Sequence, residues 1–373
     1  MRKLNRSLRR QTGKDTLAIT ALKILVLVEM MANVHWHGRE VGPVMQALIE
    51  ASVLGGVDVL GPMPNTKKGL TTARRVVNYI RKAAGFVPPG RKCTFLPIIQ
   101  LTENTTREEL VRCKAAGIND GKIYPKDRTT KSKLGVKRYG KMLQVVKWCG
   151  ELCIKVHVHF EHPNMSVSNR DAEYLCLPIC QMFLEETDAV IIWEHGSDAR
   201  CIPIWKQFAV LYPGRFYVTL TAHHLVWNED GAFGDVRKKC RPPIKTEADR
   251  LQFIYLVGED RYWVMAGGDD AAHPIGAKHV HEGKCACGAA TYHFLVQLYA
   301  HALDKLLQTK RGVKIFNRFI SRNARKLHDL PPSSSTVTLL REPFKIPPFY
   351  KVGTWTVEPP GVGEELLYQN CAL

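Results

Sequence analysis

Residues 154–161 read Ile-Lys-Val-His-Val-His-Phe-Glu, a short run rich in β-branched residues that ends in a histidine, an aromatic residue and an acid. Short apolar runs of this kind are typical of buried strands. Comparable runs recur every few tens of residues, at Lys23–Val28, Val57–Leu60, Thr94–Gln100, Lys122–Tyr124, Ala189–Trp193, Phe216–Thr221 and Tyr262–Ala266. Together with Ile154–His159 they make eight predicted strands.

Stretches with a helical spacing of apolar residues lie between these runs. They are Val44–Val53, Thr71–Ala84, Arg107–Ala116, Tyr139–Cys149, Ala172–Glu186, Pro203–Leu211 and Ala248–Leu256. Alternating strands and helices predict parallel strands with crossover helices, and eight such units favour a closed (β/α)8 TIM barrel over an open sheet. A longer helical region is expected at Ala289–Gln308.

The two ends of the chain differ from this central part. We expect residues 1–21 to form a basic N-terminal arm, residues 22–330 the barrel, and residues 331–373 a Pro-rich, strand-poor extension packed on it. The Arg-rich start and the apolar stretch Leu17–Val34 also fit a signal or transit sequence. Because Lys23 and Glu29 interrupt that stretch, we interpret it as leading into the first buried strand.

The chain is strongly basic, with a formal charge of +18 over 373 residues. The densest basic clusters, Arg2–Arg10, Lys126–Lys141 and Lys305–Lys326, do not interleave regularly with aromatic residues, so we expect a solvated basic surface or attraction of anionic metabolites rather than nucleic-acid binding. An odd count of eleven cysteines at irregular spacing predicts reduced thiols and a cytoplasmic protein. No membrane span and no structural zinc site at Cys285 and Cys287 are expected.

Polar residues fall at the carboxyl ends of the predicted strands, where α/β barrels carry their chemistry. His35 and His37 follow the first strand. Alternate residues of an extended chain point the same way, so both imidazoles can face one metal ion. Taken alone, this pair fits two hydrogen-bonded surface histidines equally well.

The later strand ends strengthen the metal interpretation. His159 and His195 end the fifth and sixth strands, and the eighth is followed by Asp269 and His273. His159 lies nearer the rim than His157, so we predict His159 as a ligand and His157 as a buried, hydrogen-bonded core histidine. A metal site is favoured by four histidines and one aspartate at the ends of four strands, namely His35, His37, His159, His195 and Asp269.

Lys122 opens the predicted fourth strand. A lysine usually packs its stem and sends its amine to solvent. In a desolvated cationic pocket, however, its pKa would fall, and the neutral amine could add carbon dioxide. The resulting carbamate could bridge two zinc ions roughly 3.5–4 Å apart.

Taken together, these residues resemble the dihydroorotase branch of the metal-dependent amidohydrolase superfamily, in its shorter homodimeric type. The resemblance runs from about Leu22 to the C-terminal tail, and the order and spacing of its markers fit together. The markers are His35 to Arg39, Met63-Pro64-Asn65, Lys122 to Pro125 with Thr129-Thr130, Val158 to Glu161, Glu194-His195, Thr221 to Leu225 and Asp269 to His273.

The resemblance implies a role for each matching residue. It implies that His35, His37 and Asp269 hold one zinc ion, that His159 and His195 hold the other, and that Lys122, as N6-carboxylysine, bridges the two Zn2+ ions of each subunit. For the substrate it implies contacts from Arg39, Asn65 and His273 to a carboxylate, from Thr129 and Thr130 on a closing loop, and from His159, Arg241 and Gly288.

The reaction implied is the reversible cyclisation of N-carbamoyl-L-aspartate to L-dihydroorotate in pyrimidine (UMP) biosynthesis. A hydroxide between the zinc ions would attack, and Asp269 would shuttle the proton. A small anionic substrate and a homodimer follow from the same resemblance.

Several residues depart from the family pattern: Gly38, Arg241, Gly268, Asp270 and Ala272. None removes a candidate ligand, but Asp270 and Arg241 could change the charge that lines the pocket. Two alternatives therefore stay open. One is another cyclic-amide hydrolase, acting on a hydantoin, a dihydropyrimidine or allantoin. The other is a catalytically silent barrel that serves as a binding partner.

Overall fold

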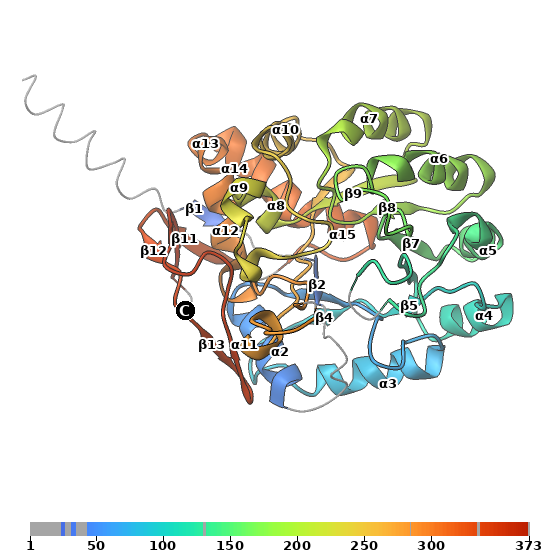
Figure 1. Ribbon diagram of the computed structural model, residues 1–373, viewed down its shortest axis with the longest axis horizontal. Coiled ribbons are helices and arrows are strands. Elements are labelled where there is room, and N and C mark those ends of the chain that lie inside the picture. Colours follow the sequence, from blue (N-terminus) through green and yellow to red (C-terminus); the bar gives the residue numbers. More distant parts are fainter. Residues whose placement is uncertain are drawn as a thin grey trace, which may run out of the picture.

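The computed structural model describes residues 24–26, 31–34, 43–129, 132–283, 285–333 and 336–371 (Figure 1). Four of the predicted site residues lie outside these ranges: His35, His37, Arg39 and Thr130. The predicted basic arm, residues 1–21, lies outside them as well.

Parallel strands follow one another in chain order within the described ranges. One ladder contains β2 (Met31–Val34), β3 (Val59–Pro62) and β4 (Thr94–Phe95), and the other contains β5 (Ile98–Gln100), β6 (Asp120–Ile123), β7 (Lys155–Val158), β8 (Ile191–Trp193), β9 (Phe216–Leu220) and β10 (Val264–Ala266). Only Leu96 and Pro97 separate β4 from β5. Because proline cannot donate a backbone hydrogen bond, we treat β4 and β5 as two parts of one interrupted strand. The segments β2 to β10 then make eight barrel strands.

Helices connect these strands, which confirms the predicted (β/α)8 barrel. They are α2 (Pro43–Leu54), α3 (Ala73–Ala84), α4 (Arg107–Ala115), α5 (Leu143–Glu151), α6 (Leu177–Glu186), α7 (Ile202–Leu211) and α10 (Glu247–Gly258). The first turns of three of these helices are capped by threonine side chains, Thr72, Thr106 and Thr246. Short 3-10 turns, η1 (Tyr139–Met142) and η2 (Tyr174–Cys176), precede α5 and α6.

The predicted first strand, Lys23–Val28, is wrong. Its central part is β1 (Ile24–Val26), which pairs antiparallel with β11 (Val337–Leu340) outside the barrel. The first barrel strand is β2, which runs parallel to β3 from Met31 beside Val59 to Val34 beside Pro62. Two short apolar runs follow each other here, and the sequence pattern does not distinguish the run that enters the barrel.

Two connections on the C-terminal side are more elaborate than predicted. Between β9 and β10 the chain forms α8 (Ala222–Val226), α9 (Glu229–Ala232) and η4 (Val236–Lys238) before α10. After β10 it forms α11 (Ile275–Lys278), η5 (Tyr292–Phe294), α12 (Leu295–Ala302), α13 (Asp304–Leu307), α14 (Lys310–Asn317), the π-helical turn η6 (Arg318–Arg322) and α15 (Asn323–Leu327). The helical region predicted at Ala289–Gln308 is therefore broken and extends further.

Helix α15 closes the barrel at the amino ends of the strands. Ala324 and Leu327 pack on a small interior core made by strand residues and their neighbours, Val59, Leu96, Ile192 and Met265. Arg325 anchors this end, because its Nη2 lies 2.7 Å from Oδ2 of Asp58, just before β3. The opposite end of the barrel, where the strands finish, carries the predicted site.

The C-terminal extension is not strand-poor, contrary to expectation. It contributes β11, β12 (Phe344–Lys345), β13 (Tyr350–Val352), β14 (Trp355–Val357), β15 (Glu365–Leu366) and β16 (Gln369–Asn370), paired in the order β1-β11-β16, β12-β15 and β13-β14. Leu339, Trp355 and Tyr368 belong to the same hydrophobic core as the barrel helices. Figure 1 shows these strands in red on the left, beside α12. The exact division into arm, barrel and extension stays a prediction.

None of the helices in the described ranges has the length and hydropathy that a bilayer-spanning segment needs.

Replacing Leu339 with alanine is expected to lower the free energy of unfolding by about 2–5 kcal/mol, because truncating a fully buried leucine leaves a cavity in the core that the extension shares with the barrel. Urea denaturation followed by circular dichroism measures the change. Leu367→Ala is the matched control: Leu367 is 38% exposed, and its truncation should cost about 0.5 kcal/mol or less. Equal effects of the two variants would contradict this packing.

Candidate active site at the carboxyl ends of the strands

Lys122 lies near the end of β6 and points into the barrel. Its side chain is fully buried, and its Nζ has no hydrogen-bond partner among the described residues. In the ladders it lies beside Gln100 of β5 and His157 of β7. Burial lowers the pKa of the Lys122 amine, against the opposing charges of Glu194 and Asp269. The usual solvent-reaching lysine is therefore excluded, and the described residues leave the amine without a hydrogen-bond partner.

His159 and His195 meet at the ends of β7 and β8. Their rings are arranged edge to face with centroids 4.4 Å apart, and each residue is 1% exposed. His195 has a φ of 45°, and its backbone N–H donates to Thr219 Oγ1 over 2.7 Å. A positive φ is uncommon for residues other than glycine and is often retained at functional sites.

Asp269 completes the convergence from the end of β10. Its φ is 42°, so the chain turns sharply just after the strand. It is buried, and its charge opposes the lowering of the Lys122 pKa by burial and adds to the rise that burial causes in the pKa of Tyr124. Of the six predicted ligands, Lys122, His159, His195 and Asp269 are described, and they lie at the carboxyl ends of four different strands, with the His159 ring against that of His195 and Asp269 in electrostatic interaction with Lys122.

A hydrogen-bonded layer lies behind these residues. Glu194 Oε2 accepts a hydrogen bond from Thr219 Oγ1 over 2.7 Å, and Glu194 Oε1 lies 2.5 Å from His157 Nδ1. The other ring nitrogen of His157 lies 3.0 Å from Asp120 Oδ1. Burial opposes ionisation of Glu194, but the charge of Lys122 and these hydrogen bonds outweigh it and lower its pKa to about 2.

His157 is fully buried between two carboxylates, which confirms its prediction as a hydrogen-bonded core histidine. Burial alone would lower the pKa of its imidazole. The hydrogen bonds with Asp120 and Glu194 outweigh burial and raise that pKa.

The carboxylate of Glu161 contacts His159 and lies near two arginines. Its Oε2 lies 2.7 Å from His159 Nε2, and its Oε1 lies 3.5 Å from Arg128 Nε and 3.6 Å from Arg241 Nη1. Burial would raise the pKa of Glu161, but His159 and the two arginines outweigh it and lower that pKa. Both arginines pair with the same carboxylate, and Thr129 directly follows Arg128 in the sequence. The predicted loop residue Thr129 and the unusual Arg241 therefore lie on the same side of the barrel mouth.

The remaining predicted substrate residues lie around the same end. Asn65 Oδ1 accepts a hydrogen bond from Tyr124 Oη over 3.2 Å, and Lys122 Nζ lies 5.5 Å from the centre of the Tyr124 ring. His273 Nε2 lies 3.0 Å from the carbonyl oxygen of Cys287. The backbone N–H of Gly288 donates to Lys239 and its carbonyl accepts from Lys278, so both of its backbone groups already have partners.

Asp270, one of the departures from the family pattern, turns away from the pocket. Its Oδ1 accepts hydrogen bonds from the backbone N–H groups of Thr291 and Tyr292 and from the Thr291 hydroxyl. Burial raises its pKa to about 7. Asp270 therefore fixes the start of η5, whereas Arg241 does add a positive group at the mouth.

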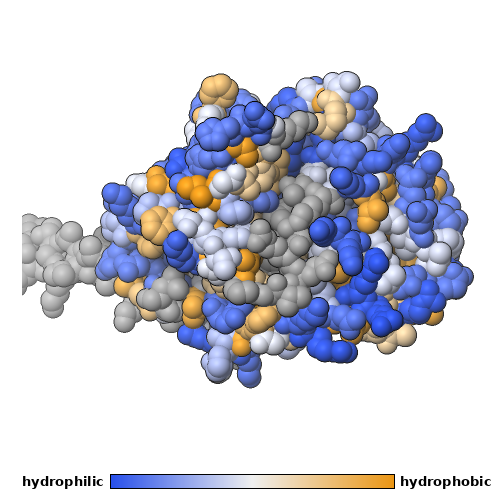
Figure 2. All heavy atoms as spheres, turned by 60° about the horizontal axis from the view of Figure 1, so that its bottom comes forward, coloured by the Kyte–Doolittle hydropathy of each residue, from blue (hydrophilic) through white to orange (hydrophobic). Residues whose placement is uncertain are grey.

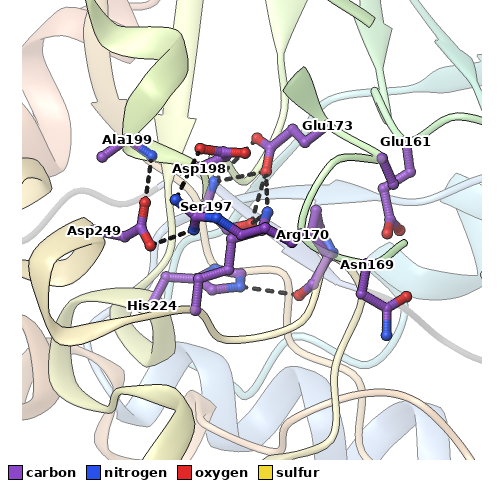
Figure 3. A network of polar contacts seen from close by, with 12 residues as sticks. Glu161, Asn169, Arg170, Glu173, Ser197, Asp198, Ala199, His224 and Asp249 are labelled. Atoms are coloured by element: carbon purple, nitrogen blue, oxygen red, sulfur yellow. Dashed lines mark hydrogen bonds and ion pairs between the residues drawn. The ribbon is translucent and has the colours of Figure 1, made fainter. Parts of the chain in front are cut away.

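Figure 3 shows a further polar network that holds the chain after β8. Glu173 accepts hydrogen bonds from Trp193 Nε1 over 3.0 Å and from the Ser197 hydroxyl over 2.7 Å, and it pairs with Lys245 Nζ at 2.8 Å. Since Trp193 and Ser197 flank His195 by two residues on either side, the network restrains the turn that presents the His195 ring.

Two residues of this region were missed by the sequence analysis. Gln100 ends β5 with a buried side-chain amide, neither atom of which is hydrogen-bonded within the described part of the chain. His223, after β9, is fully buried with both ring nitrogens likewise unbonded, and burial lowers its pKa to about 3. Both follow the strand-end pattern that identified the other site residues, which is the signal that could have found them.

Among the described residues, two groups of three side chains could hold a metal ion: His223 with His224 and Cys240, and Asp120 with His157 and His328. All six are buried, and within each group the ligand atoms lie within 4.8 Å of one another. Neither group is the predicted ligand set, which also contains residues outside the described ranges.

This arrangement, with imidazoles, a buried lysine and an aspartate meeting at the carboxyl ends of barrel strands, defines an amidohydrolase-type barrel enzyme. A scan against family models finds no match. A dihydroorotase from Leptothrix cholodnii is 30% identical over 311 residues, which cover 82% of this chain and 87% of that protein. The chain therefore belongs to the dihydroorotase family.

Solved structures share the fold. A dihydroorotase from Saccharomyces cerevisiae, in complex with 5-fluoroorotic acid, superposes with a TM-score of 0.83 at 22% identity, over 94% of this chain and 98% of that one. An L-hydantoinase (dihydropyrimidinase) from Arthrobacter aurescens gives a TM-score of 0.76 at 14% identity, over 92% of this chain and 82% of that one.

Thr219→Val is expected to lower kcat/KM about 10–100-fold, because it removes the hydroxyl that joins the His195 backbone to Glu194 behind the predicted ligands. Steady-state kinetics and zinc titration measure the effect. Thr338→Val, which makes the same change on β11, should leave both unchanged. Parental kinetics in Thr219→Val would show that this layer does not support the site.

Proposed function

We propose that the protein is a zinc-dependent dihydroorotase that interconverts N-carbamoyl-L-aspartate and L-dihydroorotate in pyrimidine biosynthesis. The observation that carries the proposal is the convergence of Lys122, His159, His195 and Asp269 in a chain of this family. The roles assigned to individual residues below are part of the proposal.

The described residues fit a pair of divalent ions. The buried Lys122 amine makes no hydrogen bond to any described residue, and two imidazoles and a carboxylate lie at the same end of the barrel. We assign one zinc ion to His35, His37 and Asp269 and the second to His159 and His195, and Lys122, as N6-carboxylysine, would be a ligand of both. When bound, the ions polarise the amide carbonyl and make water a nucleophile at neutral pH.

Asp269 is assigned the proton transfer. In ring opening its carboxylate takes a proton from the attacking water and delivers it to the ring nitrogen as the amide C–N bond breaks. In ring closure the carbamoyl nitrogen attacks the side-chain carboxyl carbon. Asp269 then takes the proton from that nitrogen and gives it to the departing carboxylate oxygen, which leaves as hydroxide and becomes water by taking one further proton from the solvent. Its place at the turn after β10 holds the carboxylate at the mouth through both directions.

Substrate binding is assigned to Arg39, Asn65 and His273, which suit a carboxylate, and to the loop that carries Thr129 and Thr130. His159, Arg241 and the backbone at Gly288 would contact the ring. The Arg241 side chain is 17% exposed and pairs with Glu161, so a guanidinium is available at the mouth, where it would favour an anion.

A groove beside this loop is lined by lysines of the basic cluster Lys126–Lys141. A cavity of about 720 Å³ is lined by lysines and one arginine, Arg112, Lys126, Lys133, Lys137 and Lys141, alongside Glu103 and Glu109. Figure 2 shows hydrophilic side chains gathered over the right-hand part of the face, toward the side where Figure 1 places α4 and α5. Positive charge near the mouth would speed capture of a dianionic substrate.

A homodimer and a cytoplasmic location are also proposed. All eleven cysteines are free thiols, as a reducing compartment requires. Light scattering on the purified protein tests the dimer.

Purified, zinc-loaded protein is expected to turn over L-dihydroorotate with a kcat/KM at least about 100-fold above that for dihydrouracil or hydantoin, because those rings lack the carboxylate for which the site has partners. Chromatographic detection of the ring-opened product measures all three. Asp269→Asn should lower turnover about 10²–10⁴-fold with little change in fold.

Turnover of dihydrouracil or hydantoin alone would instead support the related cyclic-amide hydrolases, whose barrel is similar. A zinc-loaded protein that is inert toward every substrate would support the silent barrel.

Carboxylation of Lys122 has its own test. Protein incubated with 13C-bicarbonate and zinc is expected to show a carbamate signal in its 13C NMR spectrum, because the Lys122 amine is buried and makes no hydrogen bond within the described ranges. Lys122→Ala should lack the signal, whereas Lys147→Ala, at a surface lysine, should keep it. A signal of equal intensity in Lys122→Ala would place the carbamate elsewhere.

A further inference from the structure

A second group of metal-ligating side chains lies deeper in the barrel, toward the end that α15 closes. Asp120 is the first residue of β6, His157 is on β7, and His328 directly follows α15. Their side chains are 3%, 0% and 1% exposed. The proposed mechanism gives none of the three contact with substrate.

The distances within this group suit a small divalent ion. His157 Nε2 lies 3.0 Å and His328 Nδ1 lies 3.3 Å from the same oxygen, Asp120 Oδ1. Zinc holds nitrogen and carboxylate oxygen ligands at about 2.0–2.2 Å, so neighbouring ligand atoms of a tetrahedral site are about 3.3–3.5 Å apart. The two imidazole planes are inclined by only 23°, with centroids 5.9 Å apart. Little rearrangement would be needed to bring the ligand atoms around one ion.

His328 supplies an independent observation. Neither of its ring nitrogens makes a hydrogen bond to any described residue, although Nδ1 is within ion-pair distance of Asp120. His328 Nδ1 is therefore close to Asp120 Oδ1, but the angles between the two groups are not those of a hydrogen bond. A buried polar group without a partner costs about 1–3 kcal/mol, and an ion between the three side chains would remove that cost.

His157 has the second contact that metal-bound histidines usually have. Its other ring nitrogen, Nδ1, lies 2.5 Å from Glu194 Oε1. A carboxylate on the far nitrogen fixes the tautomer and directs the Nε2 lone pair at the metal. Here that lone pair would face Asp120 and His328.

Asp120 completes the set as the anionic ligand. Its ion-pair partners in the described part of the chain are these two imidazoles, and no lysine or arginine pairs with it there. Buried carboxylates persist when they are paired or bind a metal. Two imidazoles and one carboxylate, with one position left open, match the ligand chemistry of Zn2+.

We propose that Asp120, His157 and His328 bind a third divalent metal ion, Zn2+ or an ion of similar chemistry, separate from the catalytic pair. The ion would join β6 and β7 to the residue after α15 and so stabilise the closed end of the barrel. Its ligand His157 would also connect it, through Glu194, to the layer behind the catalytic residues.

Metal analysis of the full-length protein tests the site. His328→Phe keeps an aromatic ring but removes the ligand nitrogens, and it is expected to bind about one zinc ion per chain fewer than the parent protein. His279→Ala removes an exposed histidine that pairs with Glu358 and should retain the parental zinc content. A correctly folded His328→Phe protein with parental zinc content would overturn the proposal.

Two further measurements keep the result interpretable. If His328→Phe does not fold, anomalous diffraction from crystals of the parent protein at the zinc edge should show a peak among Asp120, His157 and His328, and its absence would refute the site. Lys122→Ala should reduce zinc at the catalytic pair without removing this peak. Failure of the proposed function and failure of this inference are therefore distinguishable.

Discussion

A lysine amine enclosed in the barrel, with no hydrogen-bond partner in the described part of the chain, is the constraint on which the rest of the site depends. Removing such a group from water is costly, and the surrounding charges determine which form of it is tolerated. Lys122 cannot retreat to the surface because it lies within β6, between Gln100 and His157 in neighbouring strands. The negative charges of Glu194 and Asp269 oppose the lowering of the Lys122 pKa by burial, so the fold must place both carboxylates near the Lys122 amine.

The two layers of the site come from different parts of the fold. The proposed ligands lie on strands or within a few residues of their ends, and they are held by hydrogen bonds such as those through Thr219 and Glu194. The proposed substrate contacts lie on loops, including the one that carries Thr129. Rigid strands thus hold the reactive groups, while the loops are left to adapt to the substrate.

Much of this arrangement could be predicted from the sequence, because the barrel rule links a position in the chain to a position in space. The convergence of His159, His195 and Asp269 and the burial of His157 followed from strand ends and residue alternation. The first strand could not be identified in the same way, since β1 and β2 are both short and mostly apolar, and their pairing, of β1 with β11 and of β2 with β3, is what separates them. The orientation of Asp270 likewise depends on a contact with η5, which is distant in sequence.

The sheet formed by β1, β11 and β16 unites the two extremes of the described chain. β1 leaves the ribosome well before its partner strand β11, because all the barrel strands lie between them in the sequence. A growing chain therefore carries β1 next to β2 without its partner strand until β11 has been synthesised, although domains can otherwise begin to fold from their N-terminal side. Unpaired strand edges favour association with other chains. The time between translation of β1 and of β11 is thus the period in which this protein is most exposed to misassembly.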